Sequence, residues 1–256
     1  MSALKRTLVV GNWKMHLNAS QSSLLLHRLH ERIRILRDVE VVLAPSTLVL
    51  QPLSVQIDRR KFRLAAQNAY HKDEGAFTGE TSPQMLKEFA LSFCLVGHSE
   101  RRLHLGETDE MVAKKAEALR KKGIQPVICV GETEAQKKKG ETLKVVRKQV
   151  TDALKDWDME DKDMLPAFAY EPIWALGTNK SCTSQDARIV HEGLRVTLTK
   201  LFGERAKDIH ILYGGSVDGR NVAEYLSTTE IDGVLVGSAS LDPRAFGLLC
   251  RSGVPA

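Results

Sequence analysis

The chain has 256 residues, 43% of them hydrophobic, which is enough apolar material for one sizeable core. Its 37 lysines and arginines exceed its 32 aspartates and glutamates, so the net charge is +5, which suits an anionic small substrate or weak nucleic-acid binding. No apolar run is long enough to span a membrane, and the four cysteines form no C-x-x-C pair, so we expect no membrane span, disulfide framework or zinc site. The basic run 137–139 has no aromatic neighbours and favours a solvated turn over a nucleic-acid site. We therefore predict a soluble cytoplasmic protein with one domain over residues 1–256.

Short β-type runs alternate with helical patterns along the whole chain. The predicted strands cover residues 7–10, 39–43, 62–66, 93–96, 126–130, 165–169, 209–212 and 234–236. Each is followed by a predicted helix, and the first helix shows Leu25, Leu29, Ile33 and Leu36 at the spacing of one helical face. The next two helices are expected near 47–57 and 82–89. Eight such repeats in about 250 residues predict an α/β protein with a single (β/α)8 TIM barrel, with an open doubly wound sheet as the alternative.

In such a barrel, the residues that directly follow each strand form the active face. Glu171 follows the sixth predicted strand, and Pro172 biases it toward extended backbone. The next residues combine the large Trp174 with the permissive Gly177, a composition typical of a loop that closes and excludes water. Glu171 is therefore a candidate general base beneath a lid, although an exposed glutamate in an ordinary loop remains the alternative.

Two other strand ends carry polar side chains. Asn12 and Lys14 follow the first strand and supply a neutral donor and a cation, or alternatively a surface lysine beside a packed Trp13. His98 follows the fourth strand at the start of a predicted turn. A helix N-terminus disfavours the protonated imidazole, so we expect a neutral His98 that can donate a hydrogen bond to a substrate carbonyl. A purely structural histidine is the alternative.

Glycine-rich turns follow the last two strands, at 213–217 and 236–239. Backbone N–H groups at this position of a barrel bind phosphate, and no G-x-x-x-x-G-K-[ST] motif indicates a nucleotide instead. A base, an electrophile, a cation and a phosphate cradle, without a metal or cofactor motif, suit proton abstraction next to the carbonyl of a small sugar phosphate. The residues alone thus predict an aldose–ketose isomerase.

Five motifs occur together: Gly-Asn-Trp-Lys-Met at 11–15, Gly-Ala-Phe-Thr-Gly-Glu at 75–80, Gly-His-Ser-Glu-Arg-Arg at 97–102, Tyr-Glu-Pro-Ile-Trp-Ala-Leu-Gly-Thr at 170–178 and Tyr-Gly-Gly-Ser-Val at 213–217. They span nearly the whole chain, which resembles the triosephosphate isomerase family. The resemblance implies interconversion of glyceraldehyde 3-phosphate and dihydroxyacetone phosphate, in glycolysis and gluconeogenesis, without a cofactor or metal. By this resemblance, Glu171 is the base and His98 is the electrophile. Lys14 and Asn12 would contact the substrate and stabilise the oxyanion, and Glu100 would be a nearby polar partner. Residues 172–182 would form the lid, and the phosphate would be bound by Gly177, Ser216, Gly237 and Ser238.

The resemblance also implies a homodimer in which the long loop 68–80 enters a pocket beside the neighbouring site. Thr78 would then reach toward the partner's Asn12 and the partner's Lys14. Two residues depart from the family pattern: Ser238 and Asn179 stand where glycines are usual. Ser238 keeps the backbone N–H but adds a hydroxymethyl group, and Asn179 tolerates positive φ, so we expect altered lid kinetics and unaltered chemistry.

Two further functions stay open from the sequence. One is an aldolase that forms a Schiff base through Lys14. The other is a barrel that binds RNA through its basic surface.

Overall fold

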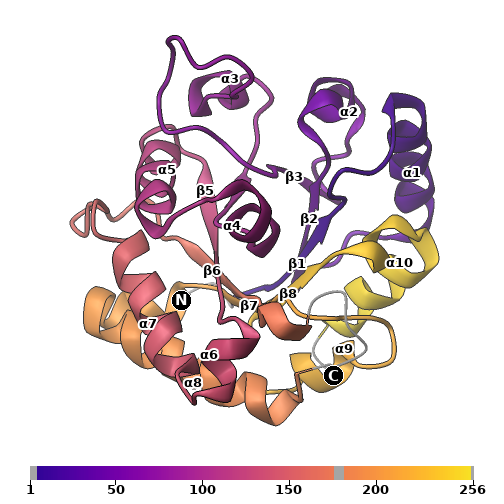
Figure 1. Ribbon diagram of the computed structural model, residues 1–256. Helices are drawn as coiled ribbons and strands as arrows, with labels where there is room; N and C mark the ends of the chain where they lie inside the picture. Colours follow the sequence, from indigo (N-terminus) through magenta and orange to yellow (C-terminus); the bar gives the residue numbers. More distant parts are fainter. Residues whose placement is uncertain (1–4, 176–181, 255–256) are drawn as a thin grey trace.

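The computed structural model describes residues 5–175 and 182–254. In these residues, eight parallel strands form a closed barrel in which each strand pairs with the next and β1 pairs with β8 (Figure 1). The strands are β1 (Thr7–Asn12), β2 (Val39–Ala44), β3 (Arg63–Ala66), β4 (Phe93–Val96), β5 (Gln125–Val130), β6 (Ala167–Tyr170), β7 (Ile211–Tyr213) and β8 (Gly233–Val236). The predicted (β/α)8 barrel is confirmed, and the β1–β8 pairing excludes the open sheet.

Helices surround the barrel (Figure 1). They are α1 (Ala19–Arg32), α2 (Leu50–Gln56), α3 (Pro83–Lys87), α4 (Ser99–Leu105), α5 (Asp109–Lys121), α6 (Glu134–Lys138), α7 (Thr142–Ala153), α8 (Ser184–Phe202), α9 (Val222–Leu226) and α10 (Pro243–Ser252). Short 3-10 turns lie at η1 (Thr47–Val49), η2 (Ile173–Ala175), η3 (Gly203–Asp208) and η4 (Ser238–Leu241). None of the helices in the described ranges has the length and apolar character needed to cross a bilayer.

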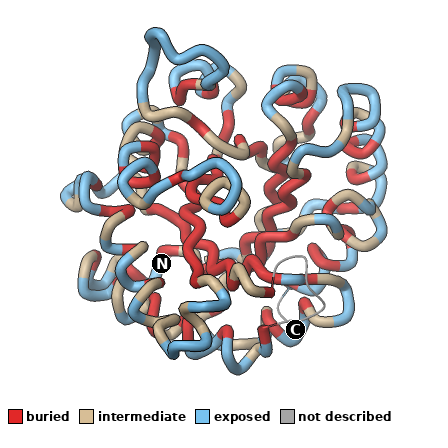
Figure 2. The backbone as a smooth tube through the Cα atoms, viewed as in Figure 1, coloured by how far each residue is buried: buried red, intermediate tan, exposed pale blue. Residues whose placement is uncertain are grey.

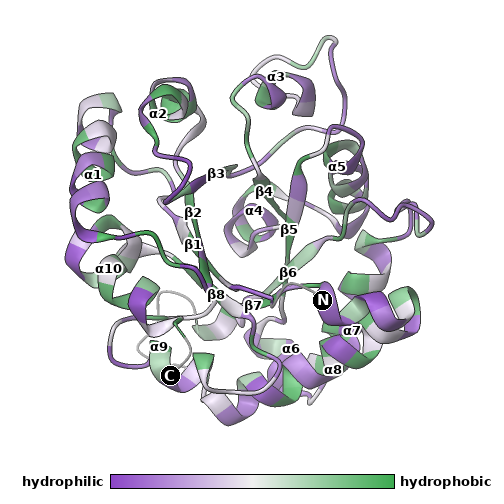
Figure 3. Cartoon of the chain, turned by 180° about the vertical axis from the view of Figure 1, so that it is seen from behind, coloured by the Kyte–Doolittle hydropathy of each residue, from purple (hydrophilic) through white to green (hydrophobic). Residues whose placement is uncertain are grey.

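The strands are buried on both faces, because side chains alternate between the barrel interior and the helix layer. In β1, Leu8 and Val10 belong to the inner apolar cluster, whereas Val9 belongs to the larger cluster between barrel and helices. Figure 2 shows this as a buried centre inside a more exposed outer ring, and Figure 3 shows mostly hydrophobic strands at the centre, surrounded by helices of mixed character. This rigid interior fixes the positions of the residues that follow each strand.

Three predictions of local structure, two helices and one turn, need correction. The first helix ends at Arg32, because Ile33 turns to an extended backbone, so Leu36 packs against the core from outside the helix. The predicted helix 47–57 divides into η1 and α2. The basic run 137–139 is a turn only at Lys139, because Lys137 and Lys138 form the last turn of α6 and Thr133 caps that helix.

The long connection between β3 and α3 contains no helix or strand, as predicted for 68–80. Its base is closed by a hydrogen bond from the Tyr70 amide to the Thr81 carbonyl (2.8 Å). The Tyr70 and Phe77 rings lie 4.7 Å apart, and Thr78 is exposed. The loop is thus held at its base and presents its far end to solvent.

Candidate active site

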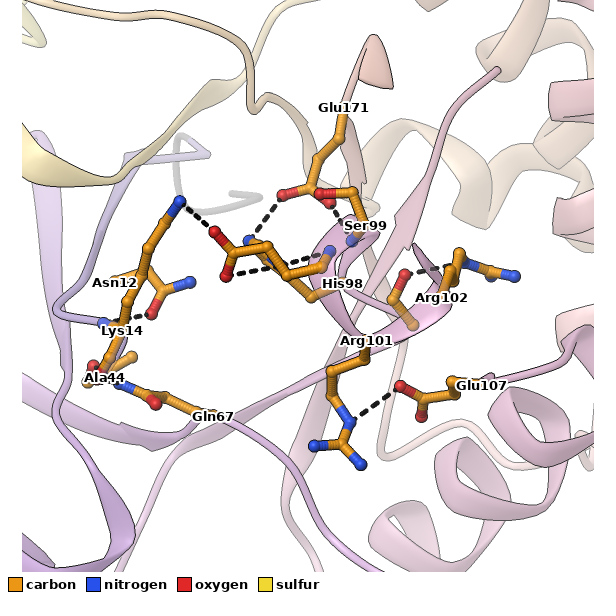
Figure 4. A network of polar contacts seen from close by, with 12 residues as sticks. Asn12, Lys14, Ala44, Gln67, His98, Ser99, Arg101, Arg102, Glu107 and Glu171 are labelled. Atoms are coloured by element: carbon orange, nitrogen blue, oxygen red, sulfur yellow. Dashed lines mark hydrogen bonds and ion pairs between the residues drawn. The ribbon is translucent and has the colours of Figure 1, made fainter. Parts of the chain in front are cut away.

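Glu171 follows β6 directly, as predicted, and only 2% of it is exposed. Its amide donates to the Val130 carbonyl (2.8 Å), so the backbone is fixed to β5. The carboxylate accepts a hydrogen bond from the Ser99 amide (2.8 Å) and lies 3.0 Å from His98 Nε2 (Figure 4). Burial raises the pKa of Glu171, but His98 and the Ser99 amide outweigh it and lower this pKa overall. Glu171 is therefore a buried carboxylate in its charged form.

His98 caps the N-terminus of α4, and its Nδ1 accepts a hydrogen bond from the Glu100 amide (3.2 Å). Nδ1 therefore carries no proton, and the ring proton lies on Nε2, which faces Glu171. Burial lowers the pKa of His98, but the Glu171 carboxylate outweighs burial and raises this pKa overall. The helix terminus expected from the sequence is present, and the nearby carboxylate opposes the neutral form that the terminus favours.

Lys14 and Asn12 are fixed at the end of β1. The Asn12 side chain accepts from the Lys14 amide (3.0 Å), and Lys14 has a left-handed backbone with φ of 52°. Gln67 holds this conformation, because its Nε2 donates to the carbonyls of Lys14 and Ala44 (both 2.9 Å). The Lys14 ammonium lies 2.6 Å from the Glu100 carboxylate. This places a cation beside the imidazole.

The predicted residues line one cavity of about 190 Å³. Its lining contains the chemical groups of β1, β4 and β6 on one side and the two glycine-rich turns on the other, namely Asn12, Lys14, His98, Glu171, Gly214, Gly215, Ser216, Val217, Leu235, Gly237 and Ser238. Gly177 and Asn179 lie outside the described residues. A cavity of this size suits a small molecule of a few carbons with one anionic group.

Comparison with known proteins gives a consistent result. A family model described as triosephosphate isomerase matches residues 7–253. The chain is 42% identical to a triosephosphate isomerase of Pediococcus pentosaceus over 244 residues, covering 95% of this chain and 97% of that relative. It is 41% identical to one of Thermoanaerobacter pseudethanolicus over 239 residues (93% and 96%) and 38% identical to one of Endomicrobium trichonymphae over 248 residues (97% and 99%). The chain belongs to the triosephosphate isomerase family. Members of this family are aldose–ketose isomerases, and this chain is an enzyme of that class.

Sequence reasoning missed several residues of this triosephosphate isomerase site. Ser99 supports Glu171, and Gln67 supports Lys14. Ser99 acts through its backbone amide, so its residue type does not reveal this role in the sequence. Gly214 was assigned only to a phosphate turn, yet a Cβ at this position would lie 2.9 Å from the Glu171 Cγ. Glu132 lies just past β5 and accepts from Trp174 Nε1 (2.8 Å), so the strand-end rule applied to β5 would have found it.

Among residues 5–175 and 182–254, no group of three His, Cys, Asp or Glu side chains could hold a metal ion. The four cysteines are buried as free thiols.

Proposed function

We propose that this enzyme interconverts glyceraldehyde 3-phosphate and dihydroxyacetone phosphate through an enediolate, with Glu171 as the base. The observation that carries the proposal is the contact of 3.0 Å between the Glu171 carboxylate and His98 Nε2 inside the 190 Å³ cavity. A proton-abstracting group and a proton-donating group lie there within reach of adjacent atoms of one small substrate.

Starting from the ketose, the Glu171 carboxylate removes a proton from the hydroxyl-bearing carbon. The C–H electron pair forms the carbon–carbon double bond, and the carbonyl oxygen becomes the enediolate oxyanion. Glu171 then returns its proton to the neighbouring carbon, and His98 moves a proton between the two oxygens. To act, Glu171 must first exchange its hydrogen bond with the Ser99 amide for contact with the substrate.

His98 is the electrophile in this scheme, and its fixed Nε2–H is directed at the carbonyl oxygen. When Glu171 turns to the substrate, His98 loses the carboxylate that raises its pKa, and the α4 N-terminus favours the neutral ring. Lys14 supplies positive charge next to the developing oxyanion, and Asn12 adds an amide donor. The negative charge that develops on the substrate oxygen is then stabilised by side chains that the fold already holds in place.

The phosphate lies, in this proposal, against the backbone N–H groups of Gly215, Ser216, Gly237 and Ser238. The segment 172–182, including Gly177, serves as the lid. Its described N-terminal end supports this role, because Trp174 is anchored by Glu132 and lies under the Lys137 ammonium, 3.2 Å from the ring centroid. A closed lid would protect the enediolate from water and from loss of its phosphate.

The test is turnover of glyceraldehyde 3-phosphate without added metal by wild type, Glu171→Gln and Glu171→Ala. Both variants should lose roughly 10²- to 10⁴-fold in kcat, because each removes the base. Their circular dichroism should match the wild type. A variant within tenfold of wild-type kcat would show that another group is the base, and an inactive wild type would refute the substrate.

We also propose that the enzyme is a homodimer in which Thr78 in loop 68–80 reaches the partner's Asn12 and the partner's Lys14. Exposed apolar side chains near both elements support an interface: Met15 is 95% exposed, and Phe77 and Met85 are also exposed. Its place in glycolysis and gluconeogenesis follows from the proposed substrate, and the cytoplasmic location remains a prediction.

Thr78→Arg should weaken the dimer, because it adds a long charged side chain at the loop tip, which the proposed dimer would bury. Sedimentation velocity at decreasing concentration should show dissociation at a higher concentration than for wild type. Thr199→Arg, on the exposed surface of α8, is the matched control. Equal dissociation of the two variants would contradict the role of the loop.

The aldolase alternative is disfavoured by the environment of Lys14. Its ammonium lies 2.6 Å from the Glu100 carboxylate, and a paired ammonium has no lone pair with which to attack a carbonyl. Salt-sensitive RNA binding remains the test of the other alternative.

A further inference from the structure

A second hollow lies between α1 and α10, on elements that do not supply the site described above. Its volume is about 370 Å³, and it is lined by Glu31, Arg32, Pro243, Arg244, Gly247, Leu248 and Arg251. Figure 1 places the two helices side by side on one flank of the barrel. We call this hollow the arginine groove.

Three exposed arginines define its charge. Within the described ranges, the guanidinium groups of Arg32, Arg244 and Arg251 have no ion pair and no hydrogen bond. By contrast, Arg188 on α8 is paired with Glu192 at 2.9 Å. A guanidinium presents a planar fork of N–H donors that matches a carboxylate or phosphate, so three unpaired groups around one hollow form an anion-binding environment.

The carboxylates near the groove have other hydrogen-bond or ion-pair partners, although the charges of Arg244 and Arg32 also act on Asp242. Asp242 caps α10 and accepts from the amides of Arg244 (2.6 Å) and Ala245 (3.0 Å). Glu31 lies 3.4 Å from His27 Nε2. Both lower the local positive potential, but neither forms a direct pair with the three guanidinium groups.

The spacing along α10 separates the charges into two ends. Arg244 and Arg251 are seven residues apart and share one helix face, so their backbones lie about 10 Å apart along the axis. Gly247 and Leu248 lie between them on the same face. A Cβ at Gly247 would lie 3.7 Å from Arg251 Nη1 and 3.9 Å from the Arg32 Cβ, so the Arg251 guanidinium extends back over the buried Gly247 toward α1.

We propose that the arginine groove binds a small molecule of the bisphosphate class, with one anionic group at Arg244 and the other between Arg251 and Arg32. Arg244 binds one phosphate and Arg251 binds the other. Arg32 faces them from α1, on the other side of the groove. The volume falls within the range of small-molecule sites and is too small for a folded partner. The site is separate from the substrate cavity and does not depend on the proposed reaction.

The test is calorimetric titration of the whole protein with 1,6-hexanediol bisphosphate and with hexyl phosphate. Saturating glycerol 3-phosphate is present to occupy the phosphate pocket at the barrel mouth. The bisphosphate should bind at least about tenfold more tightly than the monophosphate, because only it engages both ends with charge-assisted hydrogen bonds. The affinity should decrease with rising salt.

Single variants then locate the binding. Arg244→Ala and Arg251→Ala should each weaken bisphosphate binding by about tenfold, and Glu31→Gln should strengthen it. Arg188→Ala removes the same charge from α8 and should change nothing. Equal binding of the two probes, no binding at all, or an equal loss in Arg188→Ala would overturn the proposal. Because the variants fix the position of the site, each result holds whether or not the proposed isomerase reaction is correct.

Discussion

One buried histidine lies at the mouth of the barrel, and another lies on the side of α8 that faces the barrel. The two rings have different neighbours. His98 is 7% exposed and faces the Glu171 carboxylate. His191 is 0% exposed, its Nδ1 donates to the Ala187 carbonyl (2.7 Å), and its nearest rings are those of Tyr170 and Tyr213. Its Nε2 makes no hydrogen bond of good geometry among the described residues, although the Leu212 backbone acts on the charge of the ring.

This difference reverses the direction of the pKa shift. Burial lowers the pKa of His191, and the backbone of Ala187 and Leu212 and the charge of Asp232 counteract it only in part. Burial acts on His98 in the same direction, but Glu171 makes the net shift positive. The neighbouring carboxylates therefore decide the direction of the pKa shift of a buried histidine, which in our proposal separates a packing group from a member of the proton-transfer pair.

The two shifts also have opposite effects on stability. The raised pKa of His98 stabilises the fold fully below its unfolded pKa of about 6.5, and this contribution is lost as the pH rises through the folded value. The lowered pKa of His191 stabilises the fold fully above about 6.5, and this contribution is lost as the pH falls toward the folded value. Three variants can break or sharpen this comparison.

The largest effect should come from removing Nε2 of His98 while keeping its capping role. His98→Asn retains an acceptor for the Glu100 amide, and asparagine is a favourable N-cap, so the fold should survive. It should lose roughly 10²- to 10⁴-fold in kcat, because no acid remains at the substrate oxygen. His98→Gln places an amide near the Nε2 position and should retain more kcat than His98→Asn. The reverse order would show that the cap matters more than the donor.

An intermediate effect should come from Gly214→Ala, which moves the carboxylate away from the ring. The new Cβ would lie 2.9 Å from the Glu171 Cγ, and the backbone of Gly214 is not in the left-handed region that favours glycine. Displacement of the base should lower kcat roughly 10- to 100-fold. The pKa of His98, measured by NMR, should fall toward the behaviour of His191. Gly219→Ala, with open space around its Cβ, is the control. An unchanged His98 pKa would show that another group causes the shift.

The sequence located His98 and Glu171 because parallel strands end at the same edge of a barrel, so eight short apolar runs place their following residues together. It could not provide the charge state of His98, which depends on a carboxylate that only the closed barrel brings near. It also missed the support by Gln67, because one amide that bridges two carbonyls leaves no periodic or compositional signal. The predicted helix extends past Arg32 for a related reason. The apolar spacing continues beyond the residue at which the chain must turn toward β2.

The smallest effect should come from His191→Asn, and it appears only in the pH dependence of stability. Asparagine places an amide donor near the Nδ1 position but does not titrate. In wild type, the unfolded chain takes up a proton at this residue below about pH 6.5 while the folded chain does not, so stability falls by at most about 1.4 kcal/mol per pH unit. The variant starts less stable because the smaller side chain leaves a cavity. Its unfolding free energy from urea titration should nevertheless decline less steeply than that of wild type between about pH 6.5 and 5. Leu194→Ala, which opens a cavity at a buried position of the same helix without changing a titrating group, should keep the wild-type slope. If both variants keep that slope, the acid sensitivity comes from other groups, and His191 differs from His98 in its surroundings without any consequence for stability.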